Sequence, residues 1–251
     1  MTSNSTSITA DLRGQPPKAL WEAATQHSFL TAAGSGTLSD ELLGFWLAQD
    51  RIYAAHAYPR FIGNLIARIP FSPRDGMESN QEKEKDNREI LDLLVFSLQN
   101  VVREVGFFEE TARTFNLQLA GWKIRKGTRD YEAEMARVST QGTLAEGLLF
   151  LWAMEEAYFS AWKYVASLGS NQSAAVKALV NNWTSPDFEA FVTKLAGLVD
   201  RQYATSLQAT YMGDLAGTFR DTMAVWERVL ELEAAFWPVE DELRKAQLYD
   251  L

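Results

Sequence analysis

Apolar residues recur at steps of three and four along most of this chain, and this spacing constrains its fold more than any other feature. Side chains spaced in this way share one face of an α-helix. No segment shows the sustained apolar and polar alternation, bounded by turn residues, that is typical of a β-strand. With 251 residues, 47% of them hydrophobic, the chain is long enough to bury a sizeable core. The sequence therefore predicts an all-α protein, a bundle of several helices in a single domain.

Three of these apolar stripes each carry one acidic residue, because Asp50, Glu155 and Glu233 stand where the helical spacing predicts a buried side chain. The other members of the stripes are Leu43, Trp46, Tyr53, Ala57 and Phe61, then Leu148, Leu151, Trp152, Tyr158 and Trp162, then Phe219, Met223, Trp226, Leu230 and Trp237. A buried carboxylate without a partner costs several kcal/mol or takes up a proton. One polar pocket inside the bundle would explain all three.

Each of these acids also has an explanation in structure alone. An ion pair with Arg51 or Arg60 would account for Asp50. Glu155 would reach solvent if it stood at the edge of a wide apolar face. The adjacent Glu156 competes with Glu155 for a place in the pocket, but it lies about 100° further round the helix. We therefore expect Glu155 in the pocket, with Glu156 as the alternative.

Charge and composition exclude several classes of partner and chemistry. The net charge of −9 argues against nucleic acid and anionic membranes, because their phosphates require a basic surface. No run approaches the roughly 18 apolar residues of a membrane span, and the N-terminus lacks the pattern of a secretory signal, so a cytoplasmic protein is expected. The absence of cysteine removes disulfides, thiolate metal ligands and cysteine nucleophiles. A small neutral or cationic ligand fits this composition better.

Local signals place the expected elements along the chain. Residues 1–17 are polar, rich in Ser and Thr, and end in two prolines, so we expect a flexible tail before a helical domain over residues 18–251. Residues 72–88 are charged and poor in apolar side chains, which indicates an exposed loop. Helices are expected over about residues 20–32, 39–69 with a kink at Pro59, 89–105, 107–115, 128–137, 143–168, 173–180, 187–203 and 215–246.

Short motifs occur in a fixed order between Leu20 and Trp237. They are Leu20-Trp21, His27-Ser28-Phe29, Gly36-Thr37-Leu38, Gln49-Asp50-x-x-Tyr53, Tyr131 ahead of the central helix, Trp152-Ala-Met-Glu155-x-x-Tyr158-x-x-Ala-Trp162 and Glu233-x-x-Phe236-Trp237. This order resembles the TenA family of thiaminase-II-like proteins, and the central-helix motif is similar to the branch of that family that lacks cysteine. The resemblance covers nearly the whole chain.

The resemblance implies a heme-oxygenase-like bundle that hydrolyses 5-substituted 4-aminopyrimidines of thiamin salvage. The amine of an aminomethyl or formylaminomethyl derivative would be released, and hydroxymethylpyrimidine formed. No metal or organic cofactor is implied, and the family resemblance suggests a homodimer or homotetramer. Carried over to this chain, Asp50 would hold the ring nitrogen and amino group of the pyrimidine. Tyr53 and Tyr131 would orient or stack the ring, and Glu233 would be the general acid/base.

The central helix departs from the better-known branch of the family, which carries there a cysteine thought to add to the pyrimidine ring. This chain has none, so we expect an aminopyrimidine aminohydrolase rather than a thiaminase. Glu155 fits the glutamate of the cysteine-lacking branch and joins Glu233 as a catalytic candidate. Tyr158, on the same stripe, is expected to line the substrate pocket.

A second departure precedes the penultimate helix, where the family carries a further tyrosine. This stretch reads Val180-Asn181-Asn182-Trp183, and Asn181 or Trp183 would take the place of that tyrosine. These departures leave an alternative function, namely a non-catalytic member of the same fold that binds a pyrimidine or a protein partner.

The two histidines give little support to a metal or heme site. A di-iron carboxylate bundle uses Glu-x-x-His pairs, and neither His27 nor His56 has a glutamate three residues before it. The implied fold would suggest His27 as a heme ligand, but a lone histidine more often has a structural role. We therefore expect neither metal nor heme.

Overall fold

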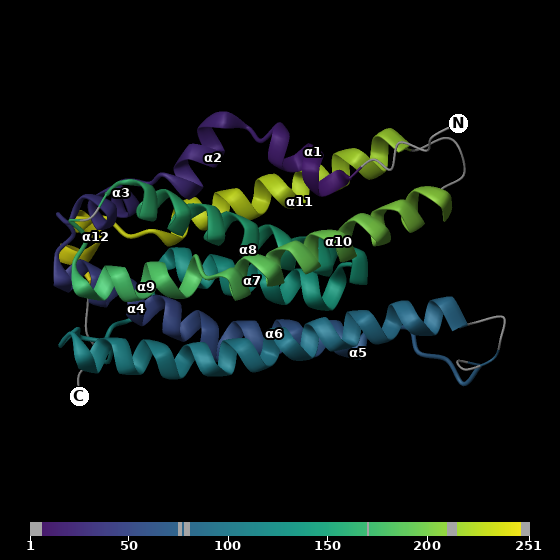
Figure 1. Ribbon diagram of the computed structural model, residues 1–251, viewed down its shortest axis with the longest axis horizontal. Helices are drawn as coiled ribbons and strands as arrows, with labels where there is room; N and C mark the ends of the chain where they lie inside the picture. The colour runs from purple at the N-terminus through teal and green to yellow at the C-terminus, as the bar shows by residue number, and fades with distance from the viewer. Residues whose placement is uncertain (1–6, 75–76, 78–80, 170, 210–214, 247–251) are drawn as a thin grey trace.

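The computed structural model describes residues 7–74, 77, 81–169, 171–209 and 215–246. These residues form an all-α bundle without a β-strand, as predicted, and the long helices run along the long axis of the molecule (Figure 1). The elements are α1 (Ile8–Gly14), α2 (Lys18–Thr25), α3 (Ser28–Ser35), α4 (Asp40–Ile52), the π-helix η1 (Tyr53–Ala57), α5 (Tyr58–Ala67), α6 (Gln81–Thr114), α7 (Lys126–Gln141), α8 (Leu144–Ser167), α9 (Ala174–Trp183), α10 (Pro186–Ala209), α11 (Leu215–Phe236) and α12 (Glu240–Lys245). No helix in these ranges is long and apolar enough to cross a membrane.

Helix α8 is the centre of the bundle. It packs against α2, α3, α10 and α11, and it is apolar around most of its circumference. The helix starts at a Thr143 cap, whose hydroxyl accepts a hydrogen bond from the Glu146 amide at 3.0 Å. On the side facing α5, Gly147 lets Leu65 approach the α8 backbone, because a Cβ at this position would clash with the Leu65 side chain. Close packing therefore fixes most α8 side chains, including those of the candidate site.

The expected kink at Pro59 takes the form of a π-helix. Instead of one helix over residues 39–69, the chain forms α4, η1 and α5 in succession. Pro59 has no N–H to give to the carbonyl four residues earlier. The Tyr58 amide bonds to the carbonyl of Tyr53 instead, which is the five-residue step of a π-helix.

Four expected boundaries need correction. Residues 81–88, expected in a loop, are the first turns of α6, which continues through Gly106 where two helices were expected. A glycine inside a helix costs only about 1 kcal/mol, and the apolar stripe of α6 runs on across Gly106. The helix expected over residues 20–32 is broken before Ser28, where His27 caps α3, and the last one ends at Phe236 because Pro238 follows.

The N-terminal segment is also corrected, as far as it is described. Residues 1–6 lie outside the described ranges, but the rest of the expected flexible tail forms α1, with Ile8 and Leu12 fully buried. Asp200 of α10 binds the start of this helix: its carboxylate accepts hydrogen bonds from the Ser7 hydroxyl at 2.8 Å and the Thr9 amide at 2.9 Å. The burial of Ile8 and Leu12 and the hydrogen bonds to the half-buried Asp200 therefore stabilise a helix where the polar composition predicted a tail.

Candidate active site

One cavity in the bundle brings together the six residues that the sequence singled out. Eight elements contribute to its wall: α4, η1, α5, α6, α7, α8, α9 and α11. Its lining residues are Asp50, Tyr53, Tyr58, Glu104, Tyr131, Met154, Glu155, Tyr158, Trp183, Glu233 and Phe236. The open volume is about 40 Å³, enough for a few water molecules. A ring-sized ligand therefore requires some wall side chains to move apart.

Four carboxylates face this cavity, and each accepts a hydrogen bond from one aromatic side chain. The pairs are Tyr158 Oη to Asp50 Oδ2 at 2.7 Å, Trp183 Nε1 to Glu104 Oε1 at 2.5 Å, Tyr58 Oη to Glu155 Oε1 at 2.6 Å and Tyr131 Oη to Glu233 Oε1 at 2.5 Å. None of the described lining residues is basic. The cavity is therefore acidic, and its acids are held in place by neutral donors.

The pKa values of these acids are raised, because burial disfavours the ionised form and no described basic residue lines the cavity to offset it. Desolvation raises the pKa of Glu155 and of Glu233 to about 8, although the bonds from their tyrosines act in the opposite direction. The same cause raises the pKa of Glu104 to about 7. The pKa of Asp50 lies well above its usual range, first through burial and second through repulsion by Glu104. At neutral pH the site thus holds carboxylic acids that can donate protons.

The π-helix places two tyrosines on the same wall of the cavity. Tyr53 and Tyr58 are five residues apart, a spacing that puts side chains on different faces of an α-helix but on the same side of a π-helix. Their ring centroids lie 6.1 Å apart, with one edge toward the other face. Tyr53 also contacts Tyr131 at 5.2 Å and Phe236 at 5.7 Å between ring centroids. Pro59 thus positions Tyr58, the donor to Glu155.

Gln49 connects α4 to the start of α7. Its side-chain oxygen accepts bonds from the Arg125 amide at 2.9 Å and from the Thr128 hydroxyl at 3.1 Å, and its amide nitrogen donates to the Lys123 carbonyl at 3.2 Å. Gln49 is fully buried, so these three bonds satisfy a polar group that would otherwise destabilise the core. They also fix the first turn of α7, one turn before Tyr131.

Most of the chain matches one known protein family. A model described as the TENA/THI-4/PQQC family matches residues 17–239. The chain belongs to this family. The match spans the motifs between Leu20 and Trp237 on which the resemblance was based.

Solved structures agree with the TenA assignment at the level of the fold. A TenA homologue from Pyrococcus furiosus is 22% identical, with a TM-score of 0.72 over 92% of this chain and 98% of that one. A TenA family transcription regulator from Silicibacter sp. TM1040 is 18% identical, with a TM-score of 0.68 over 94% and 97% of the two chains. A putative TenA-like thiaminase from Sulfolobus solfataricus is 13% identical, with a TM-score of 0.66 over 96% and 99%. The fold is therefore the all-α, heme-oxygenase-like fold of these proteins.

A curated relative with a different label comes from Fusarium pseudograminearum. It is described as a probable transcription factor and is 28% identical, the match covering 85% of this chain and 47% of the relative. The chain thus spans about half the length of that protein.

The geometry resolves the alternatives for the acids of this cavity. Glu155 lines the cavity, whereas Glu156 points away and forms an ion pair with Arg13 at 2.6 Å. Asp50 has Tyr158 as its partner, while Arg51 pairs with Glu109 at 2.6 Å. The carboxylate on the second stripe is therefore Glu155, as expected, and the bond to Tyr158 rather than an ion pair with Arg51 satisfies Asp50.

Of the two residues that were expected to replace the missing tyrosine, Trp183 is the one at the cavity. It lines the cavity, whereas Asn181 is exposed and borders an outer groove. The Trp183 ring is stacked on Trp162 with centroids 4.9 Å apart and meets Tyr158 edge to face at 5.0 Å. Trp183 thus gives the cavity wall an aromatic donor held between neighbouring rings.

The sequence argument missed Glu104 and Tyr58. Glu104 lies on the α6 stripe that includes Leu94, Val101 and Phe108, so the rule that found the other acids applies to it. It was not singled out, although the helix expected over residues 89–105 includes it. Tyr58 could not be placed by α-helical spacing, since its direction depends on the π-helix.

His27 has a structural role at the start of α3. Its Nδ1 accepts a bond from the Phe29 amide at 3.2 Å, which caps the helix. Burial lowers the pKa of His27, which keeps the ring neutral for this bond. Among the described residues, no three histidine, aspartate or glutamate side chains are grouped so that they could share a metal ion.

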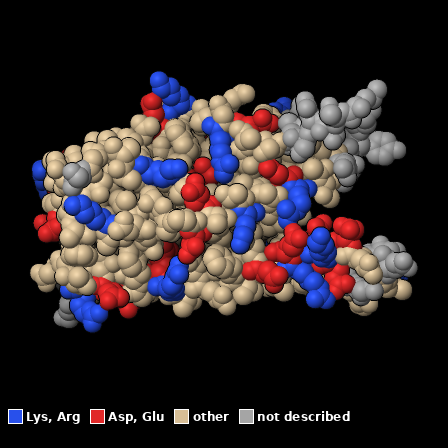
Figure 2. Space-filling model, in the orientation of Figure 1, with Lys and Arg blue, Asp and Glu red and all other residues tan. Residues whose placement is uncertain are grey.

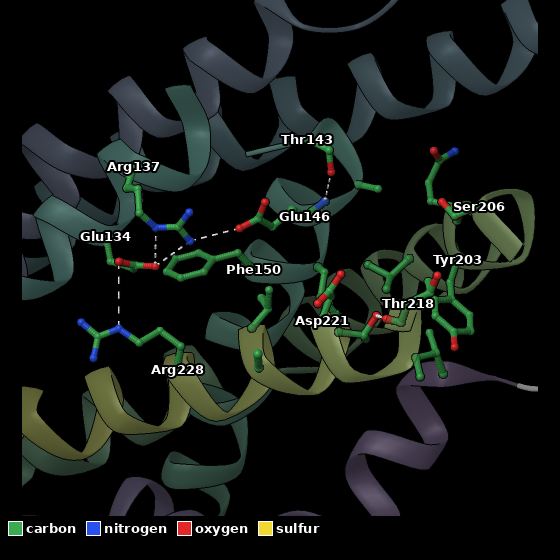
Figure 3. A pocket seen from close by; sticks show the side chains of 18 residues that line it. Glu134, Arg137, Thr143, Glu146, Phe150, Tyr203, Ser206, Thr218, Asp221 and Arg228 are labelled. Atoms are coloured by element: carbon green, nitrogen blue, oxygen red, sulfur yellow. Dashed lines mark hydrogen bonds and ion pairs between the residues drawn. The ribbon is translucent and has the colours of Figure 1, made fainter. Parts of the chain in front are cut away.

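A larger cavity of about 580 Å³ lies between α7, α8, α10 and α11, away from the candidate site (Figure 3). Four of its charged side chains form ion pairs: Arg137 contacts Glu134 at 2.8 Å and Glu146 at 3.0 Å, and Arg228 lies 4.0 Å from Glu134. None of the residues that the sequence singled out lines it. These ion pairs link α7 to α8 and α11, and the smaller, acidic cavity remains the candidate active site.

Proposed function

We propose that this protein hydrolyses the exocyclic C–N bond of a 5-aminomethyl- or 5-formylaminomethyl-4-aminopyrimidine and forms hydroxymethylpyrimidine. The observation that carries the proposal is the set of four carboxylates, each hydrogen-bonded to an aromatic donor, around one cavity of a TenA-family member. A 4-aminopyrimidine presents N–H donors and ring nitrogens in one plane. Acids that are protonated or ionised can match both kinds of group.

Asp50 and the aromatic wall would bind the ring. The Asp50 carboxyl is fixed by Tyr158 Oη and has acceptor sites left for the amino group and the adjacent ring nitrogen. Tyr158 is itself stacked on Trp237, with centroids 5.8 Å apart and planes 16° apart. Tyr53 and Tyr131 would stack on or orient the pyrimidine ring from the side of η1 and α7.

Glu233 would move the proton. In the proposed step, water adds to the exocyclic carbon while the C–N bond breaks: the carbon gains hydroxyl, and the amine leaves with one proton from Glu233, which the attacking water then restores. A carboxyl with a pKa of about 8 is protonated at neutral pH and can serve as this donor. Glu155, with a pKa also of about 8, would stabilise the charge that develops near α8. No cofactor takes part in this proposal.

Product analysis tests the proposal directly. The purified protein is incubated separately with the aminomethylpyrimidine, the formylaminomethylpyrimidine and thiamin, and hydroxymethylpyrimidine is measured by chromatography. We expect turnover of the amine to exceed that of thiamin, because the chain lacks the cysteine that would add to the ring. Equal or faster turnover of thiamin would contradict the proposal. A matched Glu233→Gln sample controls for contaminating hydrolases.

A non-catalytic role is the second candidate, and the label of the Fusarium relative is the observation that favours it. In that case the cavity would bind a pyrimidine without hydrolysis, and the bundle would report its presence to a partner. Saturable binding of the aminomethylpyrimidine without product formation would support this candidate. We further propose a cytoplasmic homodimer or homotetramer, as the family resemblance implies, and light scattering on the purified protein checks the assembly.

A further inference from the structure

A groove with a volume of about 1240 Å³ lies between α6 and the pair α9 and α10. Acidic and basic side chains lie side by side on the surface over these helices (Figure 2). Besides the contacts of Trp183 in α9 with Glu104, Phe107 and Phe108 in α6, two contacts between α6 and α10 bridge the groove. Arg201 of α10 binds Glu89 of α6 at 2.6 Å, and the rings of Phe96 and Phe191 lie 5.4 Å apart. The two walls of the groove are thus joined at a few points, unlike the closely packed centre of the bundle.

Glu104 is the place where this groove meets the acidic cavity. Of the described residues, it is the one that lines both spaces. Trp183 Nε1 holds its carboxylate at 2.5 Å, and the Asn182 side chain also donates to it. An ionised carboxylate has about four acceptor positions, so these two donors leave room for a ligand.

Glu104 also marks the side of the cavity that adjoins the groove. The cavity is too small for a pyrimidine as it stands, so one side must open. Asp50 and Glu233 are buried, and Glu155 and Glu104 are both half-buried, but of these four acids Glu104 is the one that borders the groove. Its pKa of about 7 is the lowest of the three values raised to 7 or 8, so Glu104 ionises before Glu155 and Glu233.

We propose that Glu104 is a specificity residue that binds the amine nitrogen of the pyrimidine's 5-substituent, with the ligand entering from the groove between α6 and α10. This inference rests on the proposed function of the cavity. A carboxylate at this place attracts an ammonium or N–H donor, and no described basic residue in the cavity lining competes with it. A hydroxymethyl group, which is neutral, gains less from the same contact. Glu104 therefore distinguishes the amine substrate from the alcohol product.

Equilibrium binding tests whether Glu104 recognises the amine in particular or contributes equally to the binding of both pyrimidines. Dissociation constants are measured by calorimetry for aminomethylpyrimidine and hydroxymethylpyrimidine, on the wild type and on Glu104→Gln. We expect the variant to bind the amine about 10- to 100-fold more weakly, the usual effect of losing a charge-assisted hydrogen bond. Affinity for the alcohol should change by less than about 3-fold. The Gln side chain can still accept the bond from Trp183, so the fold is retained.

Two further variants complete the experiment. Asp92→Asn removes an exposed groove acid that does not reach the cavity, and it should leave both affinities unchanged. Glu104→Asp keeps the charge but withdraws it by one methylene, so its effect on the amine should be smaller than that of Gln. Equal losses for both ligands, or no loss for the amine, would overturn the inference alone. If the wild type binds neither ligand, the proposed function falls together with it.

Discussion

The hydroxyl of Tyr131 lies 2.5 Å from Glu233 Oε1, and this bond joins α7 to α11 at the wall of the acidic cavity. Both side chains are almost fully buried, with exposures of 2% and 3%. Gly127, one turn before Tyr131, packs against the carbonyl of Ala235 and so brings the two helices close. The bond therefore depends on the fit between two helices and gives Glu233 a fixed direction into the cavity.

Loss of this bond should move the pH profile of the reaction. The Tyr131 hydroxyl stabilises the ionised form of Glu233 and lowers its pKa, against the effect of burial. In Tyr131→Phe the pKa of Glu233 therefore rises, and the alkaline limb of kcat against pH should shift to higher pH. Tyr158→Phe is the matched control, because its hydroxyl binds Asp50 instead. An alkaline limb that stays in place in Tyr131→Phe would contradict the assignment of Glu233.

Helical periodicity was sufficient for the fold class and for the central helix. The apolar circumference of the segment ending near residue 168 placed α8 correctly, because burial on all sides leaves that composition. The same periodicity did not predict where several helices begin, end or are interrupted. The first turns of α6 are too polar to be recognised from the sequence, and α1 is held by Asp200, a partner far away in the chain.

The candidate site was predictable to the extent that its acids lie on α-helical stripes. Asp50, Glu155 and Glu233 obey this rule, and they meet in one cavity. The hydrogen-bond partners could not be assigned, since Tyr58 depends on a π-helix and Trp183 on the approach of α9 to α6. Side-chain direction after a local change of helix type is set by backbone hydrogen bonding, which residue spacing does not reveal.

The ligand-free protein should become less stable as the pH rises from about 4.5 to about 8. The carboxyls of Glu155 and Glu233 have a raised pKa of about 8 when folded and an ordinary one near 4.5 when unfolded. In this window the native state binds more protons, so raising the pH favours unfolding. Glu233→Gln should flatten the dependence by roughly 3 °C per pH unit. Calorimetric melting temperatures of both proteins check this, and identical slopes would show that Glu233 is ionised in the native state.

Asp50→Asn should weaken binding more than it slows the bound complex. A recognition contact that is the same in ground and transition states appears mainly in KM. At a ligand concentration of about 100 times the wild-type Kd, the wild type should gain roughly 2.7 kcal/mol of stability, and the variant clearly less. Thermal shift assays with the aminomethylpyrimidine measure the difference. A shift of equal size in both proteins would exclude this contact.

Gly127→Ala should damage the site through the backbone. A Cβ at this position would clash with the carbonyl oxygen of Ala235, so α7 must move away from α11. We expect destabilisation of about 1–3 kcal/mol and a marked loss of activity, since Tyr131 moves with α7. Gly106→Ala is the control, because a Cβ there meets no atom within 4 Å and the helix should gain up to about 1 kcal/mol. Denaturant unfolding gives both values, and a neutral Gly127→Ala would disprove the close approach.

Glu233→Gln should abolish turnover while the fold and ligand binding remain. The carboxyl is desolvated and has a pKa of about 8, which suits a group that gives and regains a proton at neutral pH. An amide of the same shape can accept the bond from Tyr131 but cannot transfer a proton, so chemistry is separated from packing. General acid/base groups contribute about 10²- to 10⁴-fold, and kcat should fall by at least that order. Single-turnover rates, together with calorimetric binding of the same pyrimidine, make the comparison. A variant that keeps more than about a tenth of the wild-type kcat would show that the proton comes from elsewhere, with Glu155 as the next group to test.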